Sequence, residues 1–211
     1  AVENEEGRGV EAGIKSALFD NKINFTLTAY DIRLKNVRVN NPESSINGGP
    51  DPDAPQYTLA GRQTSRGVEF DCNFDLGKSL TFFGAVGYVE AVISNAAEYD
   101  NNRQRARVPR ANAGAGARWR PHSGPVKGLF VTGGVSYIGS SRYNNAMYDL
   151  VIPGYSLVSA GVGYDFSFNI KRKINNRMQV NINNLLNHQY VTNAASGGPR
   201  RAVQVSYRLG F

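Results

Sequence analysis

The last ten residues of the chain, 202–211 (AVQVSYRLGF), constrain its fold more than any other segment. Apolar side chains alternate there with polar or small ones: Val203, Val205, Tyr207, Leu209 and Phe211 against Gln204, Ser206, Arg208 and Gly210. Because the side chains of a β-strand alternate with period two, one face of this strand is apolar and the other is polar. A soluble domain gains little by ending on an exposed aromatic residue. The pattern is typical of a strand with lipid on one side and water on the other.

Earlier segments repeat the same alternation. The clearest is residues 68–76, where Val68, Phe70, Cys72, Phe74 and Leu76 alternate with Glu69, Asp71, Asn73 and Asp75. These polar groups would be costly to bury in a soluble core, but they stay hydrated when they face a watery lumen. Similar segments lie at residues 10–18, 23–29, 80–91, 110–120, 129–137, 158–168 and 178–182. The sequence therefore predicts an all-β fold, an antiparallel transmembrane β-barrel segment of about nine strands without an amphipathic helix.

The connections between these segments alternate in length. Short or moderate connections at residues 20–21, 77–78, 121–128 and 169–176 alternate with long polar ones at 40–56, 94–109, 140–154 and 187–199. Outer-membrane barrels have tight periplasmic turns and long extracellular loops, so the last strand is expected to end in the periplasm. With an odd number of strands, the first and last strands would be parallel, whereas bacterial barrels have even strand numbers and antiparallel neighbours. We therefore expect residues 1–211 to be the C-terminal portion of a longer barrel, which the intact mass of the purified protein would test.

The composition excludes several classes of protein. Twenty-four Lys and Arg against 17 Asp and Glu give a net charge of +7, but the basic residues are scattered and form no nucleic-acid-binding stripe. The charge is compatible with a solvated surface, with an anionic ligand, or with anionic lipid headgroups. Cys72 is the single cysteine, so no internal disulfide is possible, and it lies on the apolar side of its segment. No apolar run reaches the ~18 residues of a transmembrane helix.

Several motifs, in order, resemble those of a known family. They are residues 9–20 (GVEAGIKSALFD), 22–36 (KINFTLTAYDIRLKN), 66–69 (RGVE), 108–109 (VP), 137–139 (YIG), 181–190 (NINNLLNHQY), 198–200 (GPR) and the terminal Phe. Together they resemble the C-terminal part of the barrel of TonB-dependent outer-membrane receptors, in the siderophore-receptor branch. The resemblance covers essentially the whole chain. It implies a 22-stranded barrel with a plugged lumen, a known size class, whose plug domain, TonB-contacting segment and earlier strands are outside this chain.

The resemblance also implies a function. The expected protein is a receptor in the bacterial outer membrane that binds a scarce ligand, a ferric siderophore by expectation, and imports it with energy supplied by TonB. The siderophore would be the transported ligand, and no cofactor is expected. The expected partners are outer-membrane lipid, the barrel assembly machinery, the remaining N-terminal part of the receptor and, through that part, the TonB complex. The alternatives are a passive pore or structural barrel, an importer of cobalamin, sugar or peptide, and a soluble β-sandwich binding module.

No enzyme constellation is recognisable, and we expect the protein not to be an enzyme. His122 and His188 lie in connections without Cys, Asp or Glu at metal-ligand spacing, so no metal site is predicted. Arginine pairs well with anionic oxygen, and tyrosine offers a rigid ring with a polar tip. The predicted ligand-binding residues therefore lie in two long loops: Tyr99, Arg103, Arg105 and Arg107 in one, and Arg142, Tyr143 and Tyr148 in the next. His188, near the long-loop side, is a weaker candidate. By resemblance, Tyr207, Leu209 and Phe211 form a barrel-assembly signal.

Overall fold

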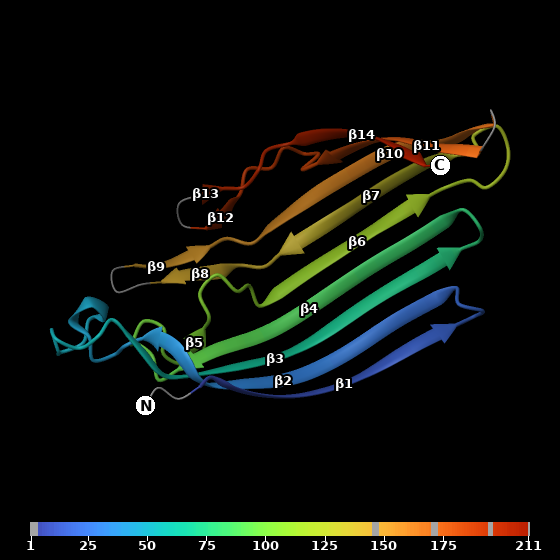
Figure 1. The fold of residues 1–211 in the computed structure, drawn as a ribbon. Coiled ribbons are helices and arrows are strands. Elements are labelled where there is room, and N and C mark those ends of the chain that lie inside the picture. Colours follow the sequence, from blue (N-terminus) through green and yellow to red (C-terminus); the bar gives the residue numbers. More distant parts are fainter. Residues whose placement is uncertain (1–3, 145–147, 170–172, 194–195, 211) are drawn as a thin grey trace.

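The predicted antiparallel β-sheet is confirmed. The computed structural model describes residues 4–144, 148–169, 173–193 and 196–210. Nine long strands follow one another across a single curved sheet (Figure 1). They are β1 (Glu6–Leu18), β2 (Ile23–Asn40), β3 (Tyr57–Leu76), β4 (Leu80–Ser94), β6 (Ala111–Trp119), β7 (Leu129–Ile138), β10 (Tyr155–Asn169), β11 (Lys173–Asn183) and β14 (Ala202–Gly210). A short strand, β5 (Arg103–Gln104), adds to the edge of β4.

The strand ends agree with the predicted connection at 40–56, but not with the one at 169–176. β2 ends at Asn40 and β3 begins at Tyr57, well before the apolar alternation of β3 starts, and the two extended strands pair with each other. The connection predicted at 169–176 is wrong in its extent, because β11 begins at Lys173 and pairs with Asn169. Polar residues from Asn175 to Arg177 interrupt the apolar pattern there, yet the backbone ladder continues through them. Strand pairing uses backbone N–H and C=O groups, so it can extend beyond the segment whose side chains alternate.

The strand register gathers the apolar side chains on one face of the sheet. Val131, Val162, Val180 and Val205 form a row across β7, β10, β11 and β14. Phe25, Cys72 and Gly84 form a corresponding row on β2, β3 and β4. We call this the apolar face, and the opposite one, which carries Glu69, Asp71 and Asn73, the polar face. Val205 is 69% exposed and Val162 is 45% exposed, so the apolar face is uncovered. A large exposed apolar surface of this kind marks contact with another apolar phase.

The long loops and the short connections lie at opposite ends of the sheet, as the sequence predicted (Figure 1). The long loops contain small elements: the 3-10 helix η1 (Ser45–Asn47), the hairpin of β8 (Ser141–Asn144) with β9 (Asp149–Ile152), and the hairpin of β12 (Val191–Asn193) with β13 (Ser196–Gly197). At the other end, the β1–β2 turn places Phe19, Asp20 and Asn21 at positive φ. Asp and Asn tolerate this conformation better than most residues.

β1 and β14 lie at the two edges of the sheet, separated by eight antiparallel pairings. They therefore run in the same direction, and in the described residues they do not pair with each other. Buried apolar side chains are few in this part of the chain: Val39, Ala91, Ala96, Ala97, Phe130 and Ile152. Among the described residues no helix is long and apolar enough to cross a membrane. Within the described ranges, most apolar side chains of the sheet are therefore not buried in a core. Side chains from distant segments meet at its long-loop end.

Candidate functional site

The first long loop is fixed by an amide network centred on Asn47. Its side chain donates hydrogen bonds to the carbonyl oxygens of Asn41 (3.0 Å) and Gln56 (2.7 Å) and accepts one from the Tyr99 hydroxyl (3.1 Å). Burial raises the pKa of the Tyr99 phenol above its usual range, and the nearby Asp100 and Tyr57 act in the same direction. Tyr99, predicted to contact ligand, thus joins the loop at 41–56 to the loop at 95–110. It stays half-buried in this loop contact.

Two of the predicted arginines meet on one carboxylate. Asp149 of β9 accepts a hydrogen bond from Arg103 Nη1 (3.2 Å) and two from Arg142, whose Nε lies 3.1 Å from Oδ1. Arg142 lies on β8, which pairs with β9, so the hairpin places Arg142 close to Asp149. Arg103 belongs to the preceding long loop. All three side chains remain partly exposed, at 39–43%. The cluster presents two guanidinium groups for one carboxylate, and it carries a net positive charge.

A second contact between the same two loops involves Arg107 and Tyr143. The Arg107 guanidinium carbon lies 5.1 Å from the centre of the Tyr143 ring, within the range of a cation–π interaction. The backbone N–H of Arg107 donates to the Arg142 carbonyl oxygen at 2.7 Å. We call Arg103, Arg107, Arg142, Tyr143 and Asp149 the loop cluster. The structure thus brings four of the seven predicted ligand-binding residues together.

The remaining predicted residues lie elsewhere. The guanidinium of Arg105 donates to the side chain of Gln63 on β3, and its backbone N–H donates to the Ala91 carbonyl oxygen (2.6 Å), so Arg105 is directed at the sheet. Tyr148 is 56% exposed next to Asp149 in sequence. His122 lies in the β6–β7 connection at the short-connection end, away from the loop cluster.

An aromatic hollow at the base of the last long loop was not predicted from the sequence. Tyr155, at the start of β10, lies 4.2 Å from Tyr190 between ring centres, and the His188 ring is nearly parallel to Tyr190 at 6.4 Å. Arg200 and Gly198 are among the other residues that line this hollow, whose volume is about 560 Å³. His188, the weaker candidate, is thereby placed in a concave site. Tyr155 and Tyr190 were missed because they meet only through the folding of the loop between β11 and β14.

The base of this loop is held by Asn184, which is 4% exposed. Its side chain donates to the carbonyl oxygens of His188 (2.8 Å) and Pro199 (3.1 Å) and accepts from the His188 backbone N–H (2.8 Å). Asn184 itself adopts a positive φ of 50°. In the part of the chain that the structure describes, no three His, Cys, Asp or Glu side chains gather in a way that could hold a metal ion. The side-chain groups that meet at the long-loop end are guanidinium, carboxylate, phenol and imidazole groups.

The proposed assembly signal lies at the opposite end of the last strand. Tyr207 and Leu209 are exposed on β14, and the Tyr207 hydroxyl donates to the Asn176 side chain on β11. Phe211, the third residue of that prediction, lies outside the described residues.

The fold and its uncovered apolar face define an antiparallel β-barrel segment of the kind that crosses an outer membrane. Residues 2–185 match the family model for the TonB-dependent receptor-like β-barrel. The chain belongs to this family, as the sequence motifs predicted. It is part of a bacterial outer-membrane protein, and its family consists of receptors and transporters rather than enzymes.

Individual relatives agree with this assignment. The metal-pseudopaline receptor CntO of Pseudomonas aeruginosa is 26% identical over 90% of this chain and 25% of its own length. The ferrichrome outer membrane transporter/phage receptor of Escherichia coli is 27% identical over 88% of this chain and 23% of its own length. The chain thus spans about a quarter of the length of these curated relatives.

Solved structures show the same fold. The ferripyoverdine receptor of Pseudomonas aeruginosa superimposes with a TM-score of 0.71 at 23% identity, covering 98% of this chain and 27% of that one. BauA, the ferric preacinetobactin receptor of Acinetobacter baumannii, gives a TM-score of 0.74 at 21% identity, covering 95% of this chain and 29% of that one.

Proposed function

We propose that this chain is the C-terminal wall of a ligand-gated importer that takes up a ferric siderophore with energy from TonB. The relatives named above are receptors of metal or iron complexes. On this proposal, earlier strands complete the barrel and a plug domain fills its lumen. Ligand bound at the extracellular mouth would shift the plug between conformations, which requires that the ligand interact differently with the two states.

The observation that carries the proposal is the loop cluster. Arg103, Arg107 and Arg142 converge from two loops at one end of the sheet, where the long loops of such barrels face the outside. Siderophores bind iron through oxygen groups that carry negative charge, and guanidinium groups donate several hydrogen bonds to such oxygens in a fixed geometry. Tyr143 adds a rigid aromatic surface beside them. The cluster thus has the chemistry of an anion-binding mouth.

Replacing Arg103, Arg105 and Arg107 together by Ala is expected to weaken ferric-siderophore binding about a hundredfold, because two charge-assisted contacts at about tenfold each are lost. The measurement is the dissociation constant of the full-length receptor for a panel of ferric siderophores, together with iron uptake in cells with and without TonB.

Arg105→Ala alone is the matched control, because Arg105 faces Gln63 rather than the cluster and its loss should leave affinity unchanged. Unchanged affinity in the triple variant would remove the loop cluster as the ligand site. Uptake that continues without TonB would instead support a passive pore. Tight binding of a neutral cobalamin, sugar or peptide would support an importer of that ligand.

Deletion of Phe211 is expected to lower the amount of folded receptor in the outer membrane and to leave the ligand affinity of the surviving molecules unchanged. The reason is that Tyr207, Leu209 and Phe211 are proposed to be read by the barrel assembly machinery during insertion. Folded receptor can be measured by the altered gel mobility of unheated barrels, and affinity by the same siderophore titration. Normal folded levels would contradict the assembly role, and a loss of affinity would show that the deletion distorts the barrel itself.

A further inference from the structure

Charged side chains lie on the apolar face at its long-loop end. The register places Val10, Asp31, Arg66 and Glu90 in one row across β1 to β4, directly beyond the row of Ala12, Ala29, Val68 and Tyr88. The next two rows on the same face contain Arg8 and Arg33, then Glu6, Lys35 and Arg62. We call these three rows the outer charged patch. It contains five cations and three carboxylates, all on side chains that share the orientation of the lipid-facing residues.

The position of the patch along the strands gives its depth in the membrane. Apolar-face side chains run from Leu76 to Val68 on β3 and from Leu80 to Tyr88 on β4, nine residues in each case. A tilted strand needs about 9–11 residues to cross the hydrocarbon core. Arg66 and Glu90 therefore come at the boundary between hydrocarbon and headgroups on the long-loop side. Tyr88 lies in the row just before them, as expected for an aromatic residue at a membrane interface.

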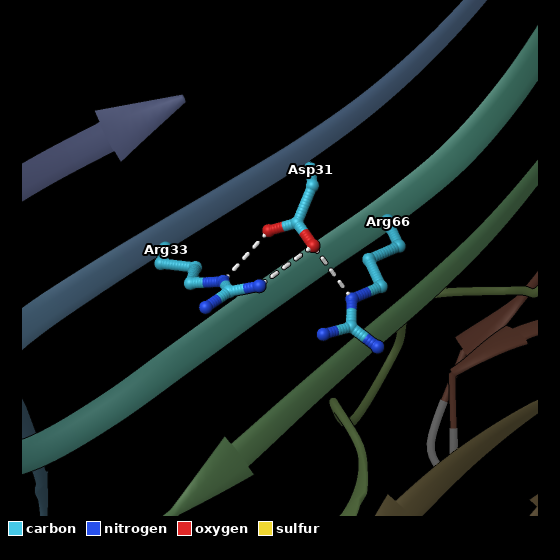
Figure 2. Close-up of polar contacts among 3 residues, drawn as sticks. All are labelled: Asp31, Arg33 and Arg66. Atoms are coloured by element: carbon cyan, nitrogen blue, oxygen red, sulfur yellow. Dashed lines mark hydrogen bonds and ion pairs between the residues drawn. The ribbon is translucent and has the colours of Figure 1, made fainter. Parts of the chain in front are cut away.

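Within the patch, Asp31 holds two arginines in place (Figure 2). Its Oδ1 accepts from Arg33 Nε at 2.9 Å, and its Oδ2 accepts from Arg33 Nη2 at 3.2 Å and from Arg66 Nε at 2.8 Å. Each guanidinium has five N–H donors, so most of the donors of Arg66 remain available outside this triad. The arginine side chains are 63% and 57% exposed. Asp31 thus orients the guanidinium groups of Arg33 and Arg66, which are exposed on the apolar face.

A third arginine, Arg8, lies beside Arg33 on the same face of the sheet. Arg8 is the direct cross-strand partner of Arg33, and like charges directly opposite each other in a sheet are destabilising. Arg8, Asp31 and Arg33, with Gly9 and Val10, line a shallow hollow on this face. Guanidinium groups bind phosphate through two parallel hydrogen bonds. The arrangement at this depth therefore fits a phosphate group that is attached to a lipid.

From this geometry we propose that Arg8, Arg33 and Arg66 form a binding site for the phosphorylated headgroup of an outer-leaflet lipid, with Asp31 as the positioning residue. The site lies on the opposite face from the lumen, and it does not depend on import activity. Arg8 on β1, Arg33 on β2 and Arg66 on β3 would bind phosphate at the boundary between hydrocarbon and headgroups on the long-loop side. The phosphate of the bound lipid would offset the charge repulsion between Arg8 and Arg33.

The test uses the full-length receptor, delipidated in detergent and titrated with lipid A carrying both phosphates or with the same lipid after removal of the phosphates. Native mass spectrometry counts the bound lipid. The wild-type receptor is expected to bind the phosphorylated form at least tenfold more tightly. The double variant Arg33→Gln/Arg66→Gln should lose about a hundredfold in affinity for that form, at about tenfold per charge-assisted contact. Arg118→Gln, on the polar face of β6, is the matched control and should have no effect.

Asp31→Asn separates positioning from net charge. The substitution makes the patch more positive, so a purely electrostatic attraction would become stronger, whereas loss of the carboxylate that orients Arg33 and Arg66 should weaken binding several-fold. Tighter binding would overturn the positioning role. Equal affinity of the wild-type receptor for the two lipid forms would overturn the site, and this comparison needs no variant to fold. If millimolar inorganic phosphate displaced the bound phosphorylated lipid as effectively as added lipid does, the assignment to a headgroup would be overturned. The site would then bind a soluble anion.

Discussion

Replacing Val180 by Arg is expected to destabilise the folded barrel by about 2–4 kcal/mol, the cost of an arginine at the middle of the lipid-facing surface of a barrel. Val180 lies on β11 in the row of Val162 and Val205, midway along the apolar face. A guanidinium group there would either lose its hydration or distort the surrounding bilayer. The measurement is the free energy of unfolding of the full-length receptor in lipid vesicles, from reversible titration with denaturant.

Gln179→Arg is the matched control for this prediction. Gln179 is the preceding residue on the same strand, and its side chain lies on the polar face, where it donates to Asn181 at 2.7 Å. The same added positive charge should therefore cost much less stability there. Equal destabilisation by the two substitutions would contradict the assignment of the apolar face to lipid. Greater destabilisation by Gln179→Arg would mean that the two faces are interchanged.

Replacing Asp165 by Ala is expected to cost about 1.5–3 kcal/mol of stability, the range for hydrogen bonds to charged groups. Asp165 on β10 accepts from Arg120 at 2.6 Å and from Arg177 at 2.6 and 3.0 Å. Its side chain is 21% exposed, and Arg208 lines the same hollow. Removal of the carboxylate leaves three arginines close together without their counter-charge. Denaturant unfolding of the full-length receptor measures the loss.

A double-mutant cycle distinguishes this ion pair from a simple packing effect. Arg177→Gln removes one cation, so the double variant Asp165→Ala/Arg177→Gln should be less destabilised than the sum of the two single variants. Strict additivity would contradict a direct interaction between the two side chains. Gln is preferred to Ala at position 177 because the Arg177 side chain also packs over the Phe130 ring, with 5.0 Å between the guanidinium carbon and the ring centre.

The architecture was predictable from the sequence because its signals are local. Side chains such as Phe70 and Asp71 define two faces by simple alternation, and each of the nine long strands coincides with such a segment, whereas the short β5 lies in a predicted loop. The alternation of short and long connections gave the two ends of the sheet. The start of β11 was harder to predict, because this strand begins in residues that do not alternate and is held there by its backbone ladder.

The candidate site was only partly predictable. The residue types of the loop cluster were recognisable, and Arg103, Arg107, Arg142 and Tyr143 do converge. The sequence offered no reason to choose them over Arg105 or Tyr99, which the structure turns toward Gln63 and Asn47. It also did not single out Asp149, which is 46 positions from Arg103 and joins the two loops. The aromatic hollow of Tyr155 and Tyr190 likewise depends on how the last loop folds back.

The sequence by itself determined that this chain forms antiparallel strands with one apolar and one polar face, and that the long loops lie at one end of the sheet. It could do so because period-two alternation and connection length are properties of each segment alone. Only the tertiary structure decided which residues meet across strands and loops. A shift of one residue in register would send every side chain of a strand to the other face. The pairing of Asp31 with Arg66, 35 positions apart, exists because the register of β2 on β3 brings them to the same face and the same depth.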